Sequence, residues 1–515
     1  GAVVAWDVGL GKARLAAALC LISGSRNNLI VVEPQLVPEM VRELMGLPID
    51  PQCWQVIHDV HNLRALRQIN IIAYNRLRGP VTPAHPRRTF ARLLRRRIGV
   101  LVADEGHLLR NPDTQQSRAL AMLSARRRYV LTATPAANYP RDVHALICTT
   151  GGDGTATQAY GFRGMYLEPV LRKTMYTATR GIDRFREDFV TLEWCVNEFA
   201  EDNRNGAKRE VPKLANVQRY RAMLAPHVLR RVHHEPEVAK YIHIPEPTRK
   251  TVTLDWDPAH LAYYLKVADE FRQVYGDMCR RASLDGKKMN LIALLARIRA
   301  VQFACSYPQH GVKGLGAYAP LTSKQRYAID RLTELSETGR KAILYADNPG
   351  VLDLLARHLR TRGISPVVFH GKMDIETRTQ QLDAEFRFGN SPTLLASLGV
   401  TQTGLNIPQA DTVLFYNRAW TAKTETQAGG RVLRPQQTND VNFEYLHLKG
   451  SIDLYQGQMV AHKFDSIHAG LDWGTPELDA EDFLHIDTIL GRFCDDLEKL
   501  HGCRGSDLRT RLATA

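Results

Sequence analysis

Short apolar runs alternate with amphipathic stretches over the first 150 residues of the chain. The runs are rich in β-branched residues, each ends in a polar or Gly/Pro-rich turn, and they lie at residues 2–5, 28–34, 69–74, 98–105 and 128–135. Runs of this length between helical stretches are typical of buried parallel strands covered by helices. In such sheets a ligand binds at the carboxyl ends of the strands. Residues that follow the runs are therefore the first candidates for chemistry.

Long, charged and mostly helical sequence follows from about residue 139 to 320, for example at 259–282 and 288–305. A second alternation of apolar runs and helices then appears at residues 341–347, 366–371, 393–398, 411–417 and 442–448. We therefore expect an α/β protein with two parallel sheets flanked by helices. The expected division is a first lobe at 1–150, helical protrusions and a linker at 151–320, a second lobe at 321–475 and a helical tail at 476–515.

The composition points to an acidic partner. Lys and Arg outnumber Asp and Glu by 68 to 54 in 515 residues, which favours nucleic acid ahead of an anionic membrane. The eight cysteines are scattered without a Cys-x-x-Cys pair, so we expect free thiols in a reducing intracellular compartment and no metal cluster. No apolar run reaches the roughly 18 to 20 residues that span a bilayer, so no membrane partner is expected. Because the chain opens inside an apolar run, we also expect that upstream sequence is missing.

An arginine-rich stretch at residues 87–97 admits two interpretations. It is either a nucleic-acid patch or the basic face of a helix that precedes a strand. Leu93 and Leu94 have the spacing of a buried helix side, so the basic face is preferred.

The stretch AWDVGLGKAR at residues 5–14 is the first chemical motif. A Gly-rich turn between a strand and a helix directs backbone N–H groups inward, where the helix N-terminus helps them to bind phosphate. Lys12 is suited to reach the outer phosphates. The alternative is a plain strand-to-helix turn, because a Gly-x-Gly-Lys match alone is only moderately specific.

Two acids follow an apolar run in the stretch VLVADEGHLLRNP. Asp104 is suited to bind Mg²⁺ directly or through water, and Glu105 to orient and deprotonate an attacking water. His107 is suited to relay the state of the nucleotide. Thr132 and Thr134 end a further strand and are expected to hydrogen-bond the acidic site and couple it to movement. The alternative is a pair of solvated acids after a strand.

Arg431 and Arg434 lie in the stretch TETQAGGRVLRPQQ of the expected second lobe. One helical turn separates them, so both guanidinium groups are expected to face the same way. Placed across a cleft from Lys12, they would act as arginine fingers on a transferring phosphoryl group. The alternative is a basic solvated face.

Taken in order, the motifs resemble the Swi/Snf-type branch of helicase superfamily two: GLGK, DEGH, LTATP, APHVLRRVHHEPE, SLGVTQTGLNIPQADTVLF and QAGGRVLRPQQ. The resemblance covers residue 1 to about 465. It implies two RecA-like lobes with helical protrusions, ATP and Mg²⁺ as cofactors, and translocation along double-stranded DNA without required strand separation.

The resemblance also implies roles for single residues. The nucleotide would be bound by Gly9, Leu10, Gly11, Lys12, Ala13 and Gly404. The catalytic set would be Lys12, Asp104, Glu105, Gln427, Arg431 and Arg434. Near the DNA backbone it places Gln35, Asn75, Arg76, Lys372, Thr401 and Asn406. Contacts of that kind do not read base sequence.

The main departure from the family pattern is Ala13, which stands where a Ser or Thr hydroxyl usually ligates Mg²⁺. We expect ATP still to bind through backbone N–H groups and Lys12, and hydrolysis to be impaired because the metal would rely on Asp104, phosphate and water. Thr401 and Gln402 replace a usual pair of glycines, which is expected to alter contacts with DNA and not with ATP.

The sequence therefore predicts an ATP-driven motor on double-stranded DNA that remodels or displaces DNA-bound proteins. Two alternatives stay open: a strand-separating helicase on DNA or RNA, and an ATP-gated DNA-binding protein in which Ala13 impairs hydrolysis. No histone-reading or zinc segment is recognisable, so the cytoplasm of a bacterium or a virus-infected cell is expected ahead of a nucleus.

Overall fold

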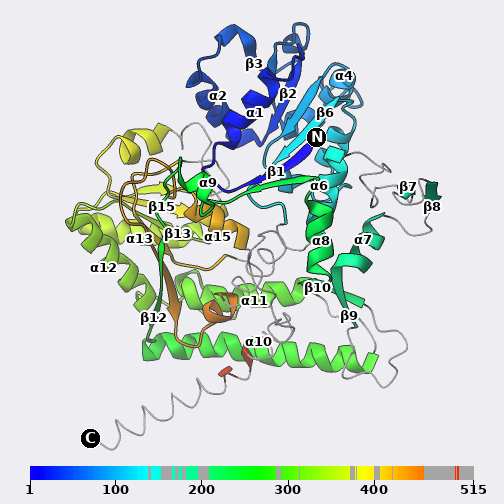
Figure 1. The fold of residues 1–515 in the computed structure, drawn as a ribbon. Coiled ribbons are helices and arrows are strands. Elements are labelled where there is room, and N and C mark those ends of the chain that lie inside the picture. The colour runs from blue at the N-terminus through cyan, green and yellow to red at the C-terminus, as the bar shows by residue number, and fades with distance from the viewer. Residues whose placement is uncertain are drawn as a thin grey trace, which may run out of the picture.

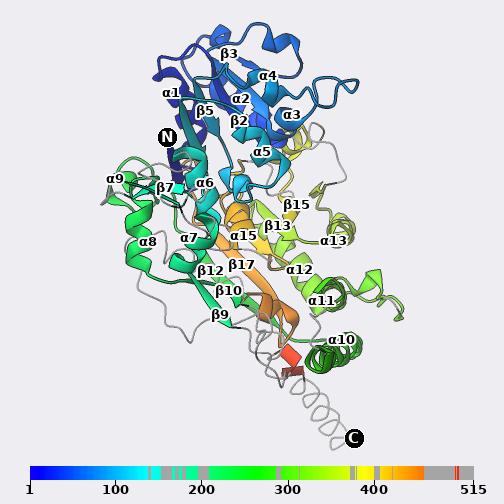
Figure 2. The same ribbon diagram turned by 90° about the vertical axis from the view of Figure 1, so that its right-hand side faces the viewer.

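The computed structural model describes residues 1–136, 141–151, 160, 165–168, 173–176, 181–194, 208–285, 291–312, 314–371, 377, 380–399, 406–419, 422–457, 493–494 and 496–497. Two α/β lobes are stacked on each other, and a helical layer lies below the second one (Figures 1 and 2).

The first lobe is built on a seven-stranded parallel sheet with the order β11-β1-β6-β5-β2-β4-β3. Its strands are β1 (Ala2–Trp6), β2 (Asn28–Val32), β3 (Trp54–Val56), β4 (Ile69–Ala73), β5 (Val100–Ala103), β6 (Arg127–Leu131) and β11 (Val228–Arg231). The central strands β2 and β5 are buried along their whole length, as their unbroken apolar runs predict.

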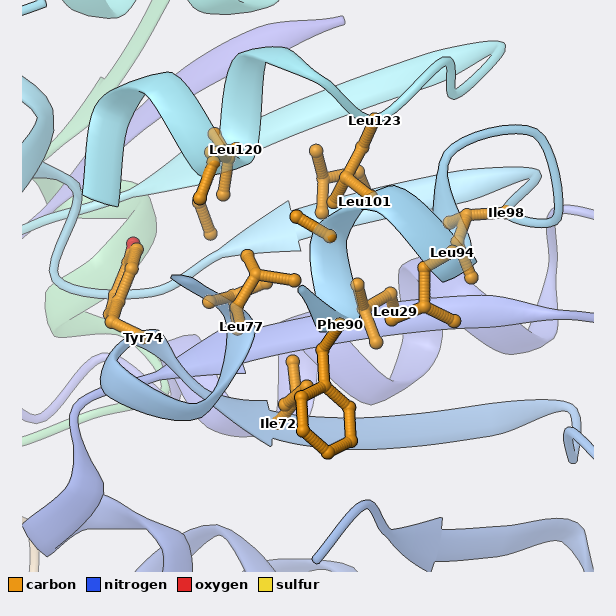
Figure 3. Close-up of a cluster of buried hydrophobic side chains, with 14 of the residues drawn as sticks. Leu29, Ile72, Tyr74, Leu77, Phe90, Leu94, Ile98, Leu101, Leu120 and Leu123 are labelled. Atoms are coloured by element: carbon orange, nitrogen blue, oxygen red, sulfur yellow. The ribbon is translucent and has the colours of Figure 1, made fainter. Parts of the chain in front are cut away.

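Helices cover both faces of this sheet. They are α1 (Lys12–Leu21), α2 (Val37–Met45), α3 (Tyr74–Arg78), α4 (Phe90–Leu94), α5 (Gln115–Ala121) and α6 (Asp142–Gly151). On one face Leu77, Phe90 and Leu94 join Leu29 and Leu101 in one buried cluster (Figure 3). Side chains of α1 and α2 form the core on the other face. The two cores fix the ends of the strands, where the candidate residues lie.

The second lobe has a six-stranded parallel sheet with the order β12-β17-β16-β13-β15-β14. Its strands are β12 (Thr248–Leu254), β13 (Ala342–Ala346), β14 (Val367–Phe369), β15 (Thr393–Ser397), β16 (Thr412–Phe415) and β17 (Asn442–Leu448). Its helices are α12 (Ser323–Glu337), α13 (Pro349–Thr361) and α15 (Ala422–Gly429), with a π-helical segment at Leu382–Arg387. The expected fold, two parallel sheets flanked by helices, is confirmed.

The stretch between the lobes is less helical than the sequence analysis expects. It contains α7 (Gly181–Phe189), α8 (Val217–Leu224), α9 (Pro236–Ala239), α10 (Pro258–Asp285) and α11 (Leu291–Ser306), with strand pairs β7 (Met165–Glu168) and β8 (Lys173–Tyr176), and β9 (Val190–Trp194) and β10 (Lys208–Leu214). It also gives β11 to the first sheet and β12 to the second. The chain therefore crosses between the lobes through two strands that are edges of the two sheets.

Three further expectations can be compared with the structure. Leu94 of α4 is buried and Leu93 is partly buried, as expected, but Arg92 is the one arginine of this stretch within α4, so a basic helix face describes only a small part of it. Of the expected tail, Phe493 and Leu497 pack in the core formed by α10 and α11, and most of the rest lies outside the described residues. Within the described residues no helix is long and apolar enough to cross a bilayer, and no group of three or more His, Cys, Asp or Glu is arranged to hold a metal ion.

Two buried histidines predict acid sensitivity. Burial lowers the pKa of both His260 and His447 to about 4 from an ordinary value of 6.5. His260 Nε2 lies 2.9 Å from the carbonyl oxygen of Ala304, whereas neither ring nitrogen of His447 has a hydrogen-bond partner among the described residues. Between pH about 6.5 and about 4 the unfolded chain binds more protons at these sites than the folded chain, so stability falls as the pH falls.

We expect the urea midpoint of unfolding to decrease between pH 7.5 and 5, and to decrease less in the double variant His260→Gln, His447→Gln. The comparison of midpoint differences between the two pH values checks this, because it cancels the cost of the substitutions themselves. Equal decreases in the two proteins would show that these histidines do not set the acid sensitivity.

Candidate functional site

The loop between β1 and α1 has the shape of a phosphate cradle. Gly9 and Gly11 have left-handed φ angles of 91° and 79°, which glycine adopts without steric cost. Gly11 is the N-cap of α1 and supplies no side-chain cap, so the first N–H groups of the helix face the loop. Lys12 Nζ donates to the carbonyl oxygens of Trp6 and Asp7, at 2.9 Å each. The ammonium group is therefore held over the loop.

Residues from outside the first lobe pack directly on this loop. A Cβ atom on Gly9 would lie 3.3 Å from Cδ1 of Ile244 and 3.6 Å from the carbonyl oxygen of Leu433. A Cβ atom on Gly430 would lie 2.9 Å from Cγ1 of Val8. The interlobe crossing and the second lobe thus both contact the cradle, and glycine on each side permits this approach.

The acid pair lies at the carboxyl end of β5. The backbone N–H of Asp104 donates to Val31, and the hydroxyl of Tyr74 donates to the carbonyl oxygen of Asp104 at 2.8 Å. Glu105 has a φ of 48°, in the left-handed region. The next residue must be glycine, because a Cβ on Gly106 would lie 2.0 Å from Cγ1 of Val130. The tight turn therefore keeps the carboxylates of Asp104 and Glu105 together at the carboxyl end of β5.

The charges of the loop and the acid pair influence each other. Burial, followed by the charge of Glu105, raises the pKa of Asp104, and Lys12 opposes this rise. Burial lowers the pKa of Lys12 to about 8, while Glu105 and Asp104 act in the opposite direction. Two carboxylates and one ammonium, all partly buried, are thus held together, and partial burial makes their interaction stronger than at an open surface.

Arg431 and Arg434 reach the same place from the second lobe. Burial lowers the pKa of Arg431, and the carboxylate of Glu105 counteracts this. The pKa of Arg434 is lowered to about 10, first by burial and then by the charge of Arg431, and Arg434 in turn lowers the pKa of Lys12. Arg431 is thus within electrostatic range of Glu105, and Arg434 of Lys12, while the catalytic roles expected of the two arginines stay predictions.

The predicted helical turn through Arg431 and Arg434 is wrong. Helix α15 ends at Gly429, and Gly430 and Arg431 form a turn in which the N–H of Arg431 donates to Ala428. Two consecutive glycines end the helix there, because glycine is a poor helix former. Oε1 of Gln427 and Nε of Arg434 are buried and have no hydrogen-bond partner among the described residues.

Of the three predicted coupling residues, His107 lies beside the acid pair, and Thr132 and Thr134 follow the neighbouring strand β6. His107 is buried, and its Nδ1 lies 3.1 Å from Oε2 of Glu105. The N–H of Thr132 donates to Val4 in β1, and Thr132 Oγ1 accepts the N–H of Thr134 at 3.1 Å. The hydrogen bonding of the two threonines to the acids stays a prediction.

Sequence reasoning missed an ion pair that anchors the cradle. Nη1 of Arg230, in β11, donates to Oδ1 of Asp7 at 2.8 Å and to the carbonyl oxygen of Ala5 at 3.0 Å. The N–H of His233 lies 3.4 Å from the other carboxylate oxygen of Asp7. The Leu-Arg-Arg stretch at 229–231 is recognisable in the sequence, but its pattern does not indicate which loop it contacts.

The predicted DNA-contacting residues of the first lobe lie at the same sheet edge as the acid pair. Gln35 follows β2 and donates to Glu33 at 2.7 Å. Asn75 and Arg76 follow β4 and are exposed. Asn406, in the second lobe, is partly buried, and its Oδ1 has no partner among the described residues. Lys372, Thr401 and Gly404 lie outside the described residues.

Ala13 and Leu10 complete the predicted nucleotide contacts. Leu10 is buried, and Ala13 is the second residue of α1 and packs partly against the core below the helix. The side chain at position 13 therefore offers only a methyl group at the edge of the cradle.

Two protein families match parts of this chain. The SNF2-related domain family matches residues 37–309, and the helicase conserved C-terminal domain matches residues 324–436. The cradle precedes the matched residues, so its interpretation rests on its own geometry.

Curated relatives are distant and mostly longer. A probable global transactivator of Orgyia pseudotsugata multicapsid polyhedrosis virus is 24% identical over 85% of this chain and 80% of its own. A SWI/SNF-related matrix-associated actin-dependent regulator of chromatin subfamily A-like protein 1 of Xenopus laevis is 24% identical over 91% of this chain and 42% of its own. The chain spans only 18% of protein CHROMATIN REMODELING 5 of Arabidopsis thaliana.

Among solved structures, the SWI2/SNF2 ATPase core of Sulfolobus solfataricus in complex with dsDNA aligns over 92% of this chain and 93% of its own, with 15% identity and a TM-score of 0.35. The Hef helicase domain of Pyrococcus furiosus aligns over 88% of this chain and 93% of its own, with 14% identity and a TM-score of 0.48. The family match to residues 37–309 covers more than half of the chain, and the protein accordingly belongs to the SNF2-related family, with two RecA-like lobes.

Proposed function

We propose that this chain is an ATP-driven motor that translocates along double-stranded DNA. One observation carries the proposal: charged groups of the two lobes lie within electrostatic range of one another, Arg431 of Glu105 and Arg434 of Lys12, while Lys12 also interacts with the acid pair. A site shared between two lobes opens and closes when its charge changes, which is how hydrolysis is converted to movement.

The cradle is suited to a nucleoside triphosphate. Gly9, Leu10, Gly11 and Ala13 surround the phosphate position with backbone N–H groups, and the ammonium of Lys12 exchanges the Trp6 and Asp7 carbonyls for phosphate oxygens. Glu105 then orients and deprotonates the attacking water, and Arg431 and Arg434 stabilise the negative charge that develops.

A divalent cation fits the acid pair. Burial raises the pKa of Asp104, and the neighbouring Glu105 raises it further, so a positive charge beside these carboxylates would relieve their repulsion. Asp104 would hold Mg²⁺, which when bound neutralises charge on the phosphates. Ala13 adds no hydroxyl ligand, so Asp104 is the one protein ligand for which the described residues give an argument.

The DNA track follows the sheet edge that carries the nucleotide. Gln35, Asn75 and Arg76 of the first lobe, with Lys372, Thr401 and Asn406 of the second, would contact the phosphate backbone without reading sequence. Loss of the bound γ-phosphate would separate the arginines from the acid pair and move one set of contacts along the duplex. Remodelling or displacement of DNA-bound protein would follow from that movement.

A second candidate is an ATP-gated DNA-binding protein without turnover. It is favoured by one observation, the methyl group of Ala13 at the edge of the cradle. In that protein ATP binding alone would close the lobes on DNA.

Hydrolysis in the presence of different nucleic acids separates these candidates. We expect ATPase activity to be stimulated most by duplex DNA, less by single-stranded DNA or RNA, and to increase by about tenfold in Ala13→Thr because a hydroxyl ligand is restored. Steady-state phosphate release measures this, with Glu105→Gln as the inactive control. Stimulation by RNA alone would contradict the duplex motor, and activity only in Ala13→Thr would favour the ATP-gated protein.

The Arg230–Asp7 ion pair is predicted to position the cradle. Arg230→Ala removes the ion-pair partner of a partly buried carboxylate next to the loop, so we expect KM for ATP to rise about tenfold, or ~1.4 kcal/mol, with a smaller change in kcat. Arg231→Ala is the matched control, because that arginine is 55% exposed and pairs with Glu235 at the surface. The exchanged pair Asp7→Arg, Arg230→Asp should recover part of the loss. Equal effects of Arg230→Ala and Arg231→Ala would argue against this role.

A further inference from the structure

Arginines gather at the edge of the first sheet that is opposite to the nucleotide site. The strands of this sheet are parallel, so their amino ends share one edge, about 17 Å from the carboxyl ends in a five-residue strand. Six exposed arginines lie in the segments that lead into β2, β4, β5 and β6 or, for Arg127, at the first residue of β6: Arg26, Arg67, Arg95, Arg96, Arg126 and Arg127. We call this set the arginine edge.

Acids are scarce along this edge, where one exposed acid, Asp50, lies two residues before Gln52 at the β4 end of the row. Residues 60–103 contain ten arginines and no Asp or Glu, and no acid occurs in residues 8–32 or 114–141. Arg67 donates to the carbonyl oxygen of Gln52, and no carboxylate of the described residues pairs with the other five. Exposed arginines usually lie near compensating acids, so a row of arginines with few acids produces a strong local positive potential.

The segments that carry the arginines are fixed to one another. The buried Asn28 donates through Nδ2 to Gln68 and Ser25, and its Oδ1 accepts the N–H of Val100. The N–H groups of Arg126 and Arg127 donate to Gly99, and the N–H of Ser124 donates to Arg95. The row is therefore held by buried backbone and amide hydrogen bonds, and the arginines are placed before any ligand arrives.

The geometry fits a linear polyanion. Adjacent strands lie about 4.8 Å apart, so arginines ahead of four adjacent strands extend over about 14 Å. A single phosphate is best bound by donors that surround it, whereas a row of arginines matches the successive phosphates of a nucleic-acid backbone. Single strands are also bound by stacking of their bases on aromatic side chains. The large exposed aromatic residues of the described chain, Tyr241 and Phe388, belong to the interlobe crossing and the second lobe.

We infer that the arginine edge binds the phosphate backbone of a second segment of duplex DNA, so that one molecule holds two duplexes. Helix α4, which leads into Arg95, lies away from α15 and the interlobe face in both views (Figures 1 and 2). The choice of duplex DNA rests on the proposed function, but the edge shares no residue with the nucleotide site or the proposed DNA track. A motor that holds a second duplex pulls one segment relative to the other.

Capture of two duplexes by one protein tests this inference. A biotinylated duplex on beads binds the full chain, and retention of a fluorescent second duplex is measured at rising salt. The variant Arg95→Gln, Arg126→Gln should retain several-fold less of the second duplex, with duplex-stimulated ATPase unchanged within twofold. The slope of log affinity against log salt should fall by about 1.8, since each lost phosphate contact contributes about 0.9.

The controls separate charge from folding and the edge from the motor. Arg95→Lys, Arg126→Lys keeps the charges and should retain the second duplex. The matched pair Arg357→Gln, Arg360→Gln removes two exposed arginines from α13 of the second lobe and should change retention little. Absence of stimulated ATPase in every protein, with edge-dependent capture, would reject the proposed motor and support the edge. Retention unaffected by the edge variant, or edge-dependent capture of RNA or polyglutamate in preference to duplex, overturns the inference.

Discussion

Burial of opposite charges at the meeting of the two lobes is the constraint on which the rest of this structure depends. Lys12, Asp104 and Glu105 come from the first lobe, and Arg431 and Arg434 come from the second. Each would be costly to bury alone. Lys12 and the acid pair compensate one another within the first lobe, whereas the two arginines have acids of the first lobe nearby only while the lobes are in contact. A ligand that adds phosphate charge or a cation changes that balance. The same groups that stabilise closure are thus those that hydrolysis would disturb.

Strands β11 and β12 connect this balance of charges to the position of the phosphate cradle. Strand β11 joins the first sheet beside β1 and places Arg230 on Asp7, immediately before the cradle. Strand β12 follows in the chain and joins the second sheet beside β17. The segment between these strands also places Ile244 against Gly9. A movement of the second lobe therefore acts on the phosphate cradle through the covalent chain as well as across the interface.

Much of the fold was predictable because its central strands are apolar throughout. The runs that form β2, β5, β13 and β15 are buried over their whole length. Unbroken apolar runs of this length are typical of parallel strands that are covered on both faces. Strands β11 and β12, each at an edge of its sheet, were missed for the opposite reason. Strand β11 alternates partly buried and exposed residues, and much of β12 is exposed, so neither gives an unbroken apolar run.

The candidate site was predictable in its parts and not in its connections. Motifs at the ends of strands indicated the cradle, the acid pair and the two arginines, because parallel topology collects strand ends at one edge. The Gly429–Gly430 pair ended the helix before Arg431, which spacing alone did not indicate. The contact of Arg230 with Asp7 depends on a pairing between residues distant in sequence. The arginine edge could be recognised as one row only once the strand order was known, because its arginines come from separate parts of the sequence.

Displacement of a third strand from a duplex tests the central claim most directly, because a translocating motor removes a triplex strand without separating the duplex. The account predicts that this protein, or its Ala13→Thr variant, displaces the third strand only with ATP, that Lys12→Ala abolishes displacement, and that a tailed duplex stays paired. Separation of the tailed duplex, or hydrolysis stimulated by duplex DNA without displacement of the third strand, would contradict it.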